Sequence, residues 1–447
     1  MPYCSAERIT AYDSSTVGRV LEHLPDGPVR NIVIKPNWVK HAATPDFPIG
    51  AMVTDSRLID AIIEACKTKY PEAEEILIGD APLQGCDWRL LVEQAGINEL
   101  VEKHRRTTGP RVLFEDLRAN RVHVSEGYIQ NRETELSGDP RGYRDVVLDQ
   151  SSFLDEISSS GKRFRVADYE PKETISNHRQ GYHRYTIAGS ILNADLLINV
   201  PKMKCHQKAG VTGALKNVVG INGNKANLVH YRHGFAHVLV DEFPPNAPLA
   251  VVAQVRVRKL VAGAPRWVFR PLQLAWRTYR RTFGIQVRGT RPNLGKRFFI
   301  SGGSWHGNDT IWRMIYDLNR IVLHGSADGG ALQPHPQRKY VAILDGLVGG
   351  EGNGPLQALP VETGLLVFAD DPFLMDMAMA SFMGFDWRKV PTLSNFRRFE
   401  GDLWAKYEPA HVRVLLDGRE YHGVDSLPVV RQYVPPPGWR GHIERDA

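Results

Sequence analysis

An alternation of buried-strand and amphipathic-helix patterns constrains the fold of this chain most. Residues 31–34 form an apolar run typical of a buried strand, residues 58–66 repeat apolar side chains at helical spacing, and residues 75–80 form a second strand pattern. A strand, a helix and another strand at this spacing are what a parallel βαβ unit requires. Further strand or helix patterns follow at 196–200, 311–321, 340–344 and 364–368. We therefore expect an α/β fold of mixed, mostly parallel sheets with flanking helices in two lobes.

Length and turn signals suggest how the chain is divided. At 447 residues, the chain is long enough for two to three domains. We expect an N-terminal α/β lobe over 1–240 with an irregular insertion at about 105–185, and a basic insertion over 241–300. A C-terminal α/β lobe would cover 301–434, and the proline-rich tail, 435–447, is expected to be loosely ordered.

The sequence contains no pattern for export or for membrane insertion. The first residues lack a basic segment followed by an apolar run, and no window approaches the ~18 apolar residues of a membrane span. The cysteines are far apart and form no C-x-x-C pair: Cys4, Cys66, Cys86 and Cys205. This spacing supports neither a zinc ribbon nor an iron–sulfur cluster. We expect a cytoplasmic protein, with a peripheral membrane association left open.

The positive charge is concentrated in one insertion. No acidic residue lies from Phe243 to Asn308, so this stretch is basic while the rest of the chain is net acidic. Within it, 271–283 predicts a helix with one aromatic face and flanking arginines. Such a helix, Pro271–Phe283, would dock on an anionic membrane surface or an acidic protein. The alternative is an arm packed on its own body or on the second copy of a homodimer. Nucleic acid is a weaker reading, because no known reader fold accompanies the charge.

The segment from Leu196 to Gly234 has the strongest functional signal. A buried-strand pattern leads into a predicted loop with three lysines and a histidine, then into a small-residue turn and a predicted helix. Glycine lets the backbone approach a ligand closely, and helix N-termini attract anions. We expect an anion or metal site whose catalytic residues are His206, Lys216 and Lys35. The alternative is a basic loop that only binds phosphate or faces solvent.

Substrate contacts are expected from both halves of the chain, in a cleft between the lobes. Ligands of open α/β sheets bind outside the carboxyl ends of the strands. The glycine-dense, acidic segment 345–355 predicts a flexible loop that covers the site or holds a sugar or a hard cation, although an ordinary solvated turn would look the same. The expected substrate-binding residues are Asn37, Lys202, Thr212, Gly213, Asn217, Asp345, Glu351 and Asn353.

A histidine group suggests a metal. If residues 230–237 are helical, then His230, His233 and His237 share one face. Imidazole is the commonest ligand of transition metals, which makes His230 and His233 candidate metal ligands. The alternative is a polar helix face, and Gly234 argues against a continuous helix.

Three motifs resemble a known family. They are Ile34-Lys35-Pro36-Asn37, the segment from Asp195 to Gly220, and DGLVGGEGNGP at 345–355. Together they resemble the family catalogued as domain of unknown function 362, over most of the chain. Many members carry a ferredoxin-like module with clustered cysteines, which this chain lacks, so the resemblance implies no iron–sulfur cluster here. The family has no general assigned reaction.

A fainter similarity is to lactate racemase and its relatives, which use a tethered nickel-pincer nucleotide. The order of His206, a glycine-rich turn and Lys216 is similar. That resemblance implies a lysine that holds the cofactor and a later histidine that ligates the metal, with His230 or His233 nearest in place. The earlier proton-exchanging histidine pair has no clear counterpart, although His178 and His183 are available. Cofactor and metal identity remain unknown.

Two functional hypotheses follow. In the first, the chain is an enzyme that performs proton or redox chemistry on a small anionic, hydroxylated substrate, with a transition metal optional. Isomerase, lyase and oxidoreductase reactions all stay open, as does a covalent cofactor on Lys216. In the second, the chain is a non-catalytic assembly protein that binds an anion or a membrane surface through Pro271–Phe283.

Overall fold

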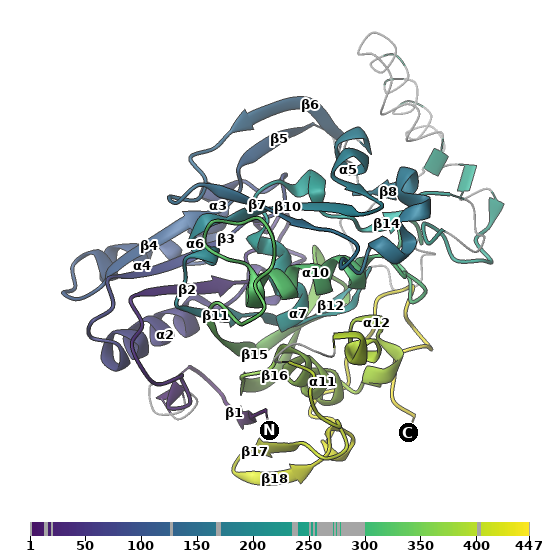
Figure 1. Cartoon of the computed structure of the whole chain (residues 1–447). Coiled ribbons are helices and arrows are strands. Elements are labelled where there is room, and N and C mark those ends of the chain that lie inside the picture. Colours follow the sequence, from purple (N-terminus) through teal and green to yellow (C-terminus); the bar gives the residue numbers. More distant parts are fainter. Residues whose placement is uncertain are drawn as a thin grey trace.

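The computed structural model has the mixed α/β architecture that the sequence predicts (Figure 1). It describes residues 2–12, 17–18, 21–125, 128–166, 171–234, 240–249, 252–253, 255–256, 271, 274, 278, 300–399 and 404–446. The expected amphipathic helix Pro271–Phe283 and His237 therefore lie outside the described residues, apart from three single positions of that helix. No helix in the described ranges is long and apolar enough to cross a membrane.

One eleven-stranded sheet contains strands from both ends of the chain. Its spatial order is β18 (Arg419–His422), β17 (Arg413–Leu416), β1 (Cys4–Arg8), β16 (Gln357–Ala369), β15 (Lys339–Asn353), β11 (Leu196–Val200), β2 (Asn31–Pro36), β3 (Glu75–Asp80) and β4 (Arg111–Asp116). A hairpin of β12 (Lys202–His206) and β13 (Gly210–Thr212) joins it by pairing with β15. The central strand β11 is parallel to both β2 and β15, so the expected N-terminal and C-terminal segments meet inside a single sheet.

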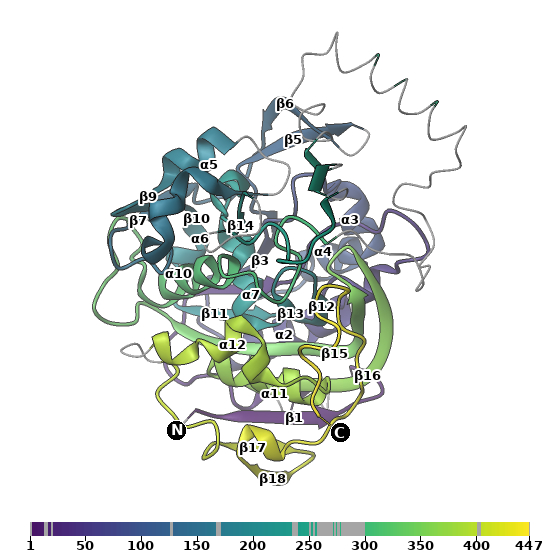
Figure 2. The same cartoon turned by 90° about the vertical axis from the view of Figure 1, so that its right-hand side faces the viewer.

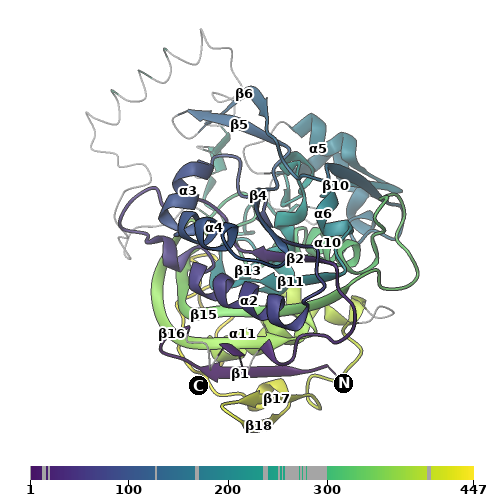
Figure 3. The same cartoon turned by 90° about the vertical axis from the view of Figure 1, so that its left-hand side faces the viewer.

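Helices cover both faces of this sheet, because alternate side chains of each strand point to opposite faces. Ile32 and Ile34 pack with α2 (Ser56–Lys69), α3 (Trp88–Gln94) and α4 (Ile97–Arg105) in one hydrophobic core. Val33 between them packs in a second core, with α10 (Ile311–His324) and α11 (Pro372–Phe382). Figure 2 shows the face with α10, α11 and the short α12 (Pro391–Ser394), and Figure 3 the face with α2, α3 and α4.

The helix boundaries follow local capping chemistry. Asp55 accepts a hydrogen bond from the Arg57 backbone N–H at the start of α2. Asp371 likewise accepts hydrogen bonds from the amides of Phe373 and Leu374, and Pro372 occupies the first turn of α11. An aspartate side chain therefore caps the first turn of both helices.

The expected irregular insertion at about 105–185 contains regular structure. Its first strand, β4, belongs to the main sheet. Beyond it lie the antiparallel hairpin of β5 (Asn120–Ser125) and β6 (Tyr128–Glu135) and a small sheet of β7 (Tyr143–Leu148), β10 (Tyr182–Ala188) and β9 (His178–Arg179). The other elements are β8 (Phe164–Arg165), which pairs with β14 (Tyr231–Arg232), and the helices α5 (Pro171–Asn177) and α6 (Gly189–Leu192).

Two expectations about loops are wrong. The glycine-dense segment from Asp345 is not a loop, because β15 runs on to Asn353 and pairs with β16 along its length. Its glycines allow close packing instead: a Cβ at Gly349 would collide with the Tyr433 hydroxyl. Antiparallel pairing supplies the backbone hydrogen bonds that a loop would leave to water.

The proline-rich tail is packed rather than loosely ordered. Tyr433 and Trp439 are almost fully buried. The Trp439 indole N–H donates to the Gln207 carbonyl at 2.8 Å, and the Gly352 N–H donates to the Val434 carbonyl at 2.8 Å. Buried aromatic side chains contribute a large apolar area, which holds this segment against the β12–β13 hairpin.

Candidate anion-binding site

The segment after β11 is a hairpin in the structure, where the sequence predicts a loop. Lys202, Lys204 and His206 occupy alternate positions of β12 and therefore share one face of the strand. Met203 and Cys205, between them, point the other way into the hydrophobic core. This alternation brings polar groups that are two residues apart into one buried layer.

The first buried pair joins two expected substrate-binding residues from distant parts of the chain. The Lys202 ammonium lies 2.9 Å from the Asp345 carboxylate, and both side chains are buried. Asp345 also accepts hydrogen bonds from the Tyr12 hydroxyl at 2.5 Å and the Asp55 N–H at 2.7 Å. With its oxygens engaged in this way, Asp345 compensates the charge of Lys202 and holds β12 to β15.

A second buried pair lies at the ends of β2 and β3. The Lys35 ammonium lies 2.8 Å from Asp80 and donates to the Pro36 carbonyl at 2.7 Å. Burial lowers the pKa of Lys35, and the charge of Asp80 opposes that shift. A Cβ at Gly220 would collide with the Asp80 carboxylate, so this close approach requires glycine.

A chain of hydrogen bonds through three asparagines connects Lys204 to the centre of the sheet. Lys204 donates to Asn37 Oδ1 at 2.5 Å, and Asn37 Nδ2 donates to Asn217 Oδ1 at 2.6 Å. Asn217 Nδ2 in turn donates to Asn199 Oδ1 at 2.7 Å. Lys204 has the Met52 carbonyl as a further acceptor. Burial, followed by repulsion from Lys202 and Lys216, holds the pKa of Lys204 well below its ordinary value.

Lys216 is presented by α7 (Ala214–Asn217), the helix predicted after the small-residue turn. Asp376 of α11 accepts hydrogen bonds from the Ala214 N–H at 2.5 Å and the Leu215 N–H at 3.0 Å, which fixes the start of this single turn. A Cβ at Gly213 would collide with that carboxylate. Burial raises the pKa of Asp376 to about 7.

The Lys216 amine differs from the other lysines of the layer. Its side chain is half-buried, and within the described ranges it makes no hydrogen bond and no ion pair. Burial and repulsion from Lys35 lower the pKa of Lys216 to about 8, against the attraction of Asp80. A lysine in such surroundings can serve as a nucleophile or a base at neutral pH.

Two imidazoles face the same charges with opposite tautomers. His206 Nδ1 accepts hydrogen bonds from the N–H groups of Lys208 at 3.1 Å and Ala209 at 3.2 Å, which places its proton on Nε2. His230 Nδ1 lies 2.6 Å from the Leu228 carbonyl and must donate to it, which leaves a lone pair on Nε2. Burial, then repulsion from Lys216, lowers the pKa of both, that of His230 to about 3.

Lys225 belongs to this layer and was missed by sequence reasoning. It is buried, and its ammonium lies 3.5 Å from the Val219 carbonyl. Burial lowers its pKa to about 7, with Asp80 opposing and Lys35 adding to the shift. It lies in the segment Asn222-Gly223-Asn224-Lys225-Ala226-Asn227, a composition that is also typical of an exposed turn, so the sequence contained no distinguishing signal.

Positive charge therefore exceeds negative charge in the buried layer. Besides the compensated pair of Lys202 and Asp345, four lysines share one carboxylate, Asp80; these lysines are Lys35, Lys204, Lys216 and Lys225. We call these four lysines, with Asp80, His206 and His230, the lysine–histidine cluster. Buried charge without a partner is costly, and a bound anion would offset that cost.

Other expected substrate-binding residues have different partners. Glu351 accepts a hydrogen bond from the Val434 N–H at 2.8 Å, and Asn353 Nδ2 donates to Gln357 Oε1 at 2.7 Å. These contacts join β15 to the tail and to β16, and none of them involves the cluster. The Thr212 hydroxyl, opposite Lys204 in the hairpin, is buried and lacks a hydrogen-bond partner in the structure as described.

The expected metal ligands His230 and His233 do not share a helix face, because Tyr231 and Arg232 between them form strand β14. Cross-strand pairing with β8 determines the backbone here. His233 Nδ1 lies 2.7 Å from Glu242, and its Nε2 contacts Arg256. Among the described residues nothing contacts His230 Nε2, so that nitrogen stays available to a ligand, and a metal at this position stays a prediction.

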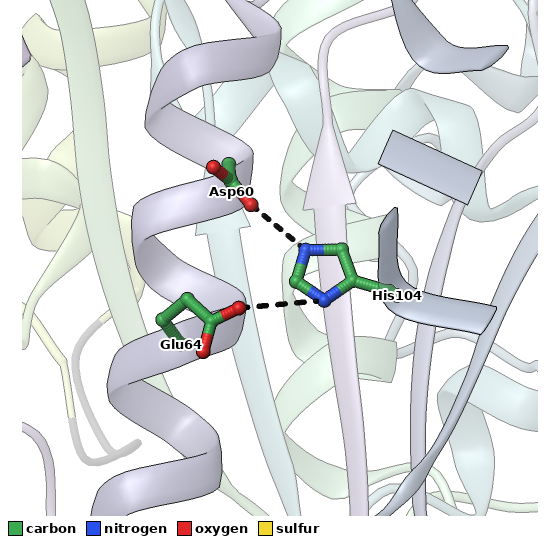
Figure 4. A group of neighbouring side chains, drawn as sticks. All are labelled: Asp60, Glu64 and His104. Atoms are coloured by element: carbon green, nitrogen blue, oxygen red, sulfur yellow. Dashed lines mark hydrogen bonds and ion pairs between the residues drawn. The ribbon is translucent and has the colours of Figure 1, made fainter. Parts of the chain in front are cut away.

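A separate group meets a simple geometric requirement for metal binding. In the described part of the chain, Asp60, Glu64 and His104 place one ligand atom each within 4.8 Å of one another (Figure 4). Lysines already occupy these atoms: Lys103 lies 2.8 Å from Asp60, and Lys67 Nζ lies 2.8 Å from His104 Nδ1. We interpret the group as an ion-pair network that joins α2 to α4. The i,i+4 spacing of Asp60 and Glu64 was its signal in the sequence.

Comparison with known proteins identifies the family to which this chain belongs. The chain matches a model described as a domain of unknown function over residues 32–139 and 134–381, which together cover most of its length. The chain belongs to this family, DUF362. The matched residues contain both buried ion pairs, the lysine–histidine cluster and the main sheet except β1, β17, β18 and the first residue of β2.

The individual proteins that match the chain are only distantly similar to it or match only a short part of it. A thylakoid-associated protein of Synechocystis sp. is 37% identical over 54 residues, which are 12% of this chain and 17% of that protein. The chain therefore spans less than a fifth of that relative's length. A Thermotoga maritima crystal structure matches with a TM-score of 0.33 and 10% identity, over 78% of this chain and 52% of that one. The lactate racemase apoprotein of Thermoanaerobacterium thermosaccharolyticum matches with a TM-score of 0.26 and 15% identity, over 51% and 40%. Similarities of this size carry no argument about mechanism.

Proposed function

We propose that this DUF362 protein binds a small anionic substrate at the lysine–histidine cluster and moves a proton on it. The observation that carries the proposal is the imbalance of charge, in which four buried or half-buried lysines share the single carboxylate of Asp80. An anion that enters this layer is attracted by several ammonium groups in a medium that screens charge weakly.

The cluster also contains a matched proton donor and acceptor. His206 offers an N–H at Nε2, and His230 offers a lone pair at Nε2. His230 would accept a proton from the substrate, while the Lys216 ammonium would donate one and the His206 N–H would stabilise the developing charge by a hydrogen bond. Lys35, paired with Asp80, and Lys204, bonded to Asn37 and the Met52 carbonyl, would keep a structural role, because these contacts already hold them. Isomerase, lyase and oxidoreductase reactions on a hydroxylated anion all use such a proton transfer.

Anion binding can be measured without knowledge of the natural substrate. The thermal unfolding midpoint is followed in inorganic phosphate, lactate or malate, against chloride at the same ionic strength. A ligand at 100 times its Kd stabilises the folded state by about 2.7 kcal/mol, which raises the midpoint. We expect at least one of these anions to raise it in the natural protein and not in Lys216→Met. Lys406→Met, which removes an exposed lysine, is the matched control.

A uniform response to every salt, or an equal response in Lys216→Met, would contradict the proposal. Elemental analysis of the purified protein tests the optional metal separately. Histidine ligation at His230 predicts a stoichiometric transition metal that is lost in His230→Ala, with the anion response measured in the same samples.

A second candidate function is recruitment to an anionic surface. It rests on the acid-free stretch from Phe243 to Asn308 and on the name of the Synechocystis relative, a thylakoid-associated protein. Co-sedimentation with vesicles that contain anionic lipid, with and without residues 254–284, tests it. We expect the deletion to abolish binding, and binding that is unchanged by the deletion would exclude this function for the segment.

A further inference from the structure

We propose that Lys216 forms an imine with the carbonyl group of an anionic aldehyde or ketone, of which a 2-oxo acid is the simplest member. This inference rests on the proposed function, because it takes the same anion site and specifies the substrate class and the reacting atom.

The first argument is the state of the five lysine amines near the centre of the sheet. Lys202 and Lys35 are held by carboxylates at 2.9 and 2.8 Å, and Lys204 by Asn37 and the Met52 carbonyl. Lys225 is buried beside the Val219 carbonyl. Lys216 alone combines a half-buried side chain with an amine that has no hydrogen-bond or ion-pair partner among the described residues. It is therefore the amine that an incoming carbonyl could meet without breaking an existing contact.

The second argument is that Lys216 is held in place from both ends of its short helix. Asp376 accepts hydrogen bonds from the first two N–H groups of α7, and Asn217, the next residue, lies in the asparagine chain. A rigid backbone under a nucleophile reduces the conformational freedom that must be lost on reaction. Burial and repulsion from Lys35 also keep a useful fraction of the amine neutral, since they lower the pKa of Lys216 to about 8.

The reaction balances within the cluster. The Lys216 nitrogen lone pair attacks the carbonyl carbon and forms a C–N bond, and the π electrons move to oxygen. Counted from the ammonium form, the nitrogen gives up one proton before the attack and one after it, the oxygen takes up two and leaves as water, and the product is the protonated imine. His230 Nε2 can accept a proton from nitrogen and return it to oxygen, while the His206 Nε2–H hydrogen-bonds that oxygen. No oxidant, reductant or further reactant is needed, and the protonated imine acidifies the neighbouring C–H bond for proton transfer.

Reductive trapping tests the imine directly. The full-length protein is incubated with pyruvate and cyanoborohydride, and the product is examined by intact mass and peptide mapping. We expect one carboxyethyl group per chain, on the peptide that contains Lys216, with labelling slowed by inorganic phosphate. Lys216→Arg keeps the positive charge and should lose the adduct, whereas Lys406→Arg should keep it. Acetone, which lacks the carboxylate, should label much more slowly than pyruvate.

The outcomes separate this inference from the proposed function. If labelling spreads over exposed lysines or equals that of Lys216→Arg while an anion still raises the unfolding midpoint, the imine is refuted and anion binding remains. If no anion changes the midpoint and no adduct forms, both are refuted. Thermal unfolding of Lys216→Arg in chloride shows that loss of the adduct does not come from loss of the fold.

Discussion

The buried ammonium of Lys225 makes a quantitative prediction about stability. Its pKa falls from 10.5 to about 7 on folding, because burial disfavours the charged form. The folded state therefore releases this proton at a lower pH than the unfolded state does. Below pH 7 the lysine is charged in both states and its destabilising effect is complete; as pH rises from 7 towards 10.5, that effect disappears.

The shift predicts a specific pH dependence for Lys225→Met. At pH 6 the lowered pKa corresponds to a destabilisation of the folded natural protein by about 5 kcal/mol. This value is an upper limit, because relaxation of the site would reduce it. At pH 9.5 the same pKa shift destabilises the folded natural protein by only about 1 kcal/mol. Methionine has a similar volume and no charge, so we expect the variant to be more stable than the natural protein at pH 6 and the gain to shrink at pH 9.5.

Urea unfolding monitored by tryptophan fluorescence measures this difference at both pH values in chloride. Any change in packing contributes equally at the two pH values, so the pH-dependent part reports the charge alone. Lys406→Met, at an exposed position, should show no comparable dependence. Phosphate at pH 6 should reduce the difference in unfolding free energy between Lys225→Met and the natural protein, because a bound anion compensates the charge of Lys225. A difference between variant and natural protein that is the same at pH 6 and 9.5 would refute this reasoning.

Three further predictions concern the contacts around the cluster. The raised pKa of Asp376 means that its carboxyl binds a proton more tightly in the folded state, so the natural protein should lose about 4 kcal/mol of stability as pH rises from 4 to 7.5. Asp376→Asn should lack this loss. Parallel pH profiles of the urea midpoints of the two proteins would contradict the prediction. Asp345→Asn leaves Lys202 buried without a counter-charge and should cost about 3–5 kcal/mol, against under ~1 for Glu420→Gln at the exposed pair with Arg413, both measured by urea unfolding. Gly220→Ala should cost about 1–3 kcal/mol through the collision with Asp80. Gly50→Ala, where a Cβ meets nothing within 4 Å, should be close to neutral, and equal unfolding midpoints for the two alanine variants would count against the clash.

The regular elements of this protein were largely readable from local patterns. The helix α2 buries the five apolar residues that its periodicity indicated, and β2, β3 and β11 lie where apolar runs predicted them. The predictions were wrong for two segments, one rich in glycine and one rich in proline. Segment 345–353 became strand because β16 pairs with it, and the tail became ordered because Trp439 packs on the hairpin. Local composition signals flexibility, but a distant partner can supply the hydrogen bonds and the apolar contact that decide the outcome.

The candidate site divides in the same way. Residue types and their order along the chain showed that Lys35, His206 and Lys216 were chemically unusual, and family membership agrees with the motifs that contain them. They could not show that Asp345 forms an ion pair with Lys202, that His233 contacts Glu242, or that Lys225 is buried.

What the sequence by itself determined is the α/β alternation and the supply of cations after its strands, since periodicity and residue type act within one turn or one strand. Which of those cations are neutralised is a property of the tertiary structure alone. The parallel placement of β11 between β2 and β15 brings Asp80 and Asp345 to particular lysines and leaves Lys216 without either. The charge that remains depends on distances between residues far apart in the chain, because electrostatic energy in a buried layer follows separation in space and not in sequence.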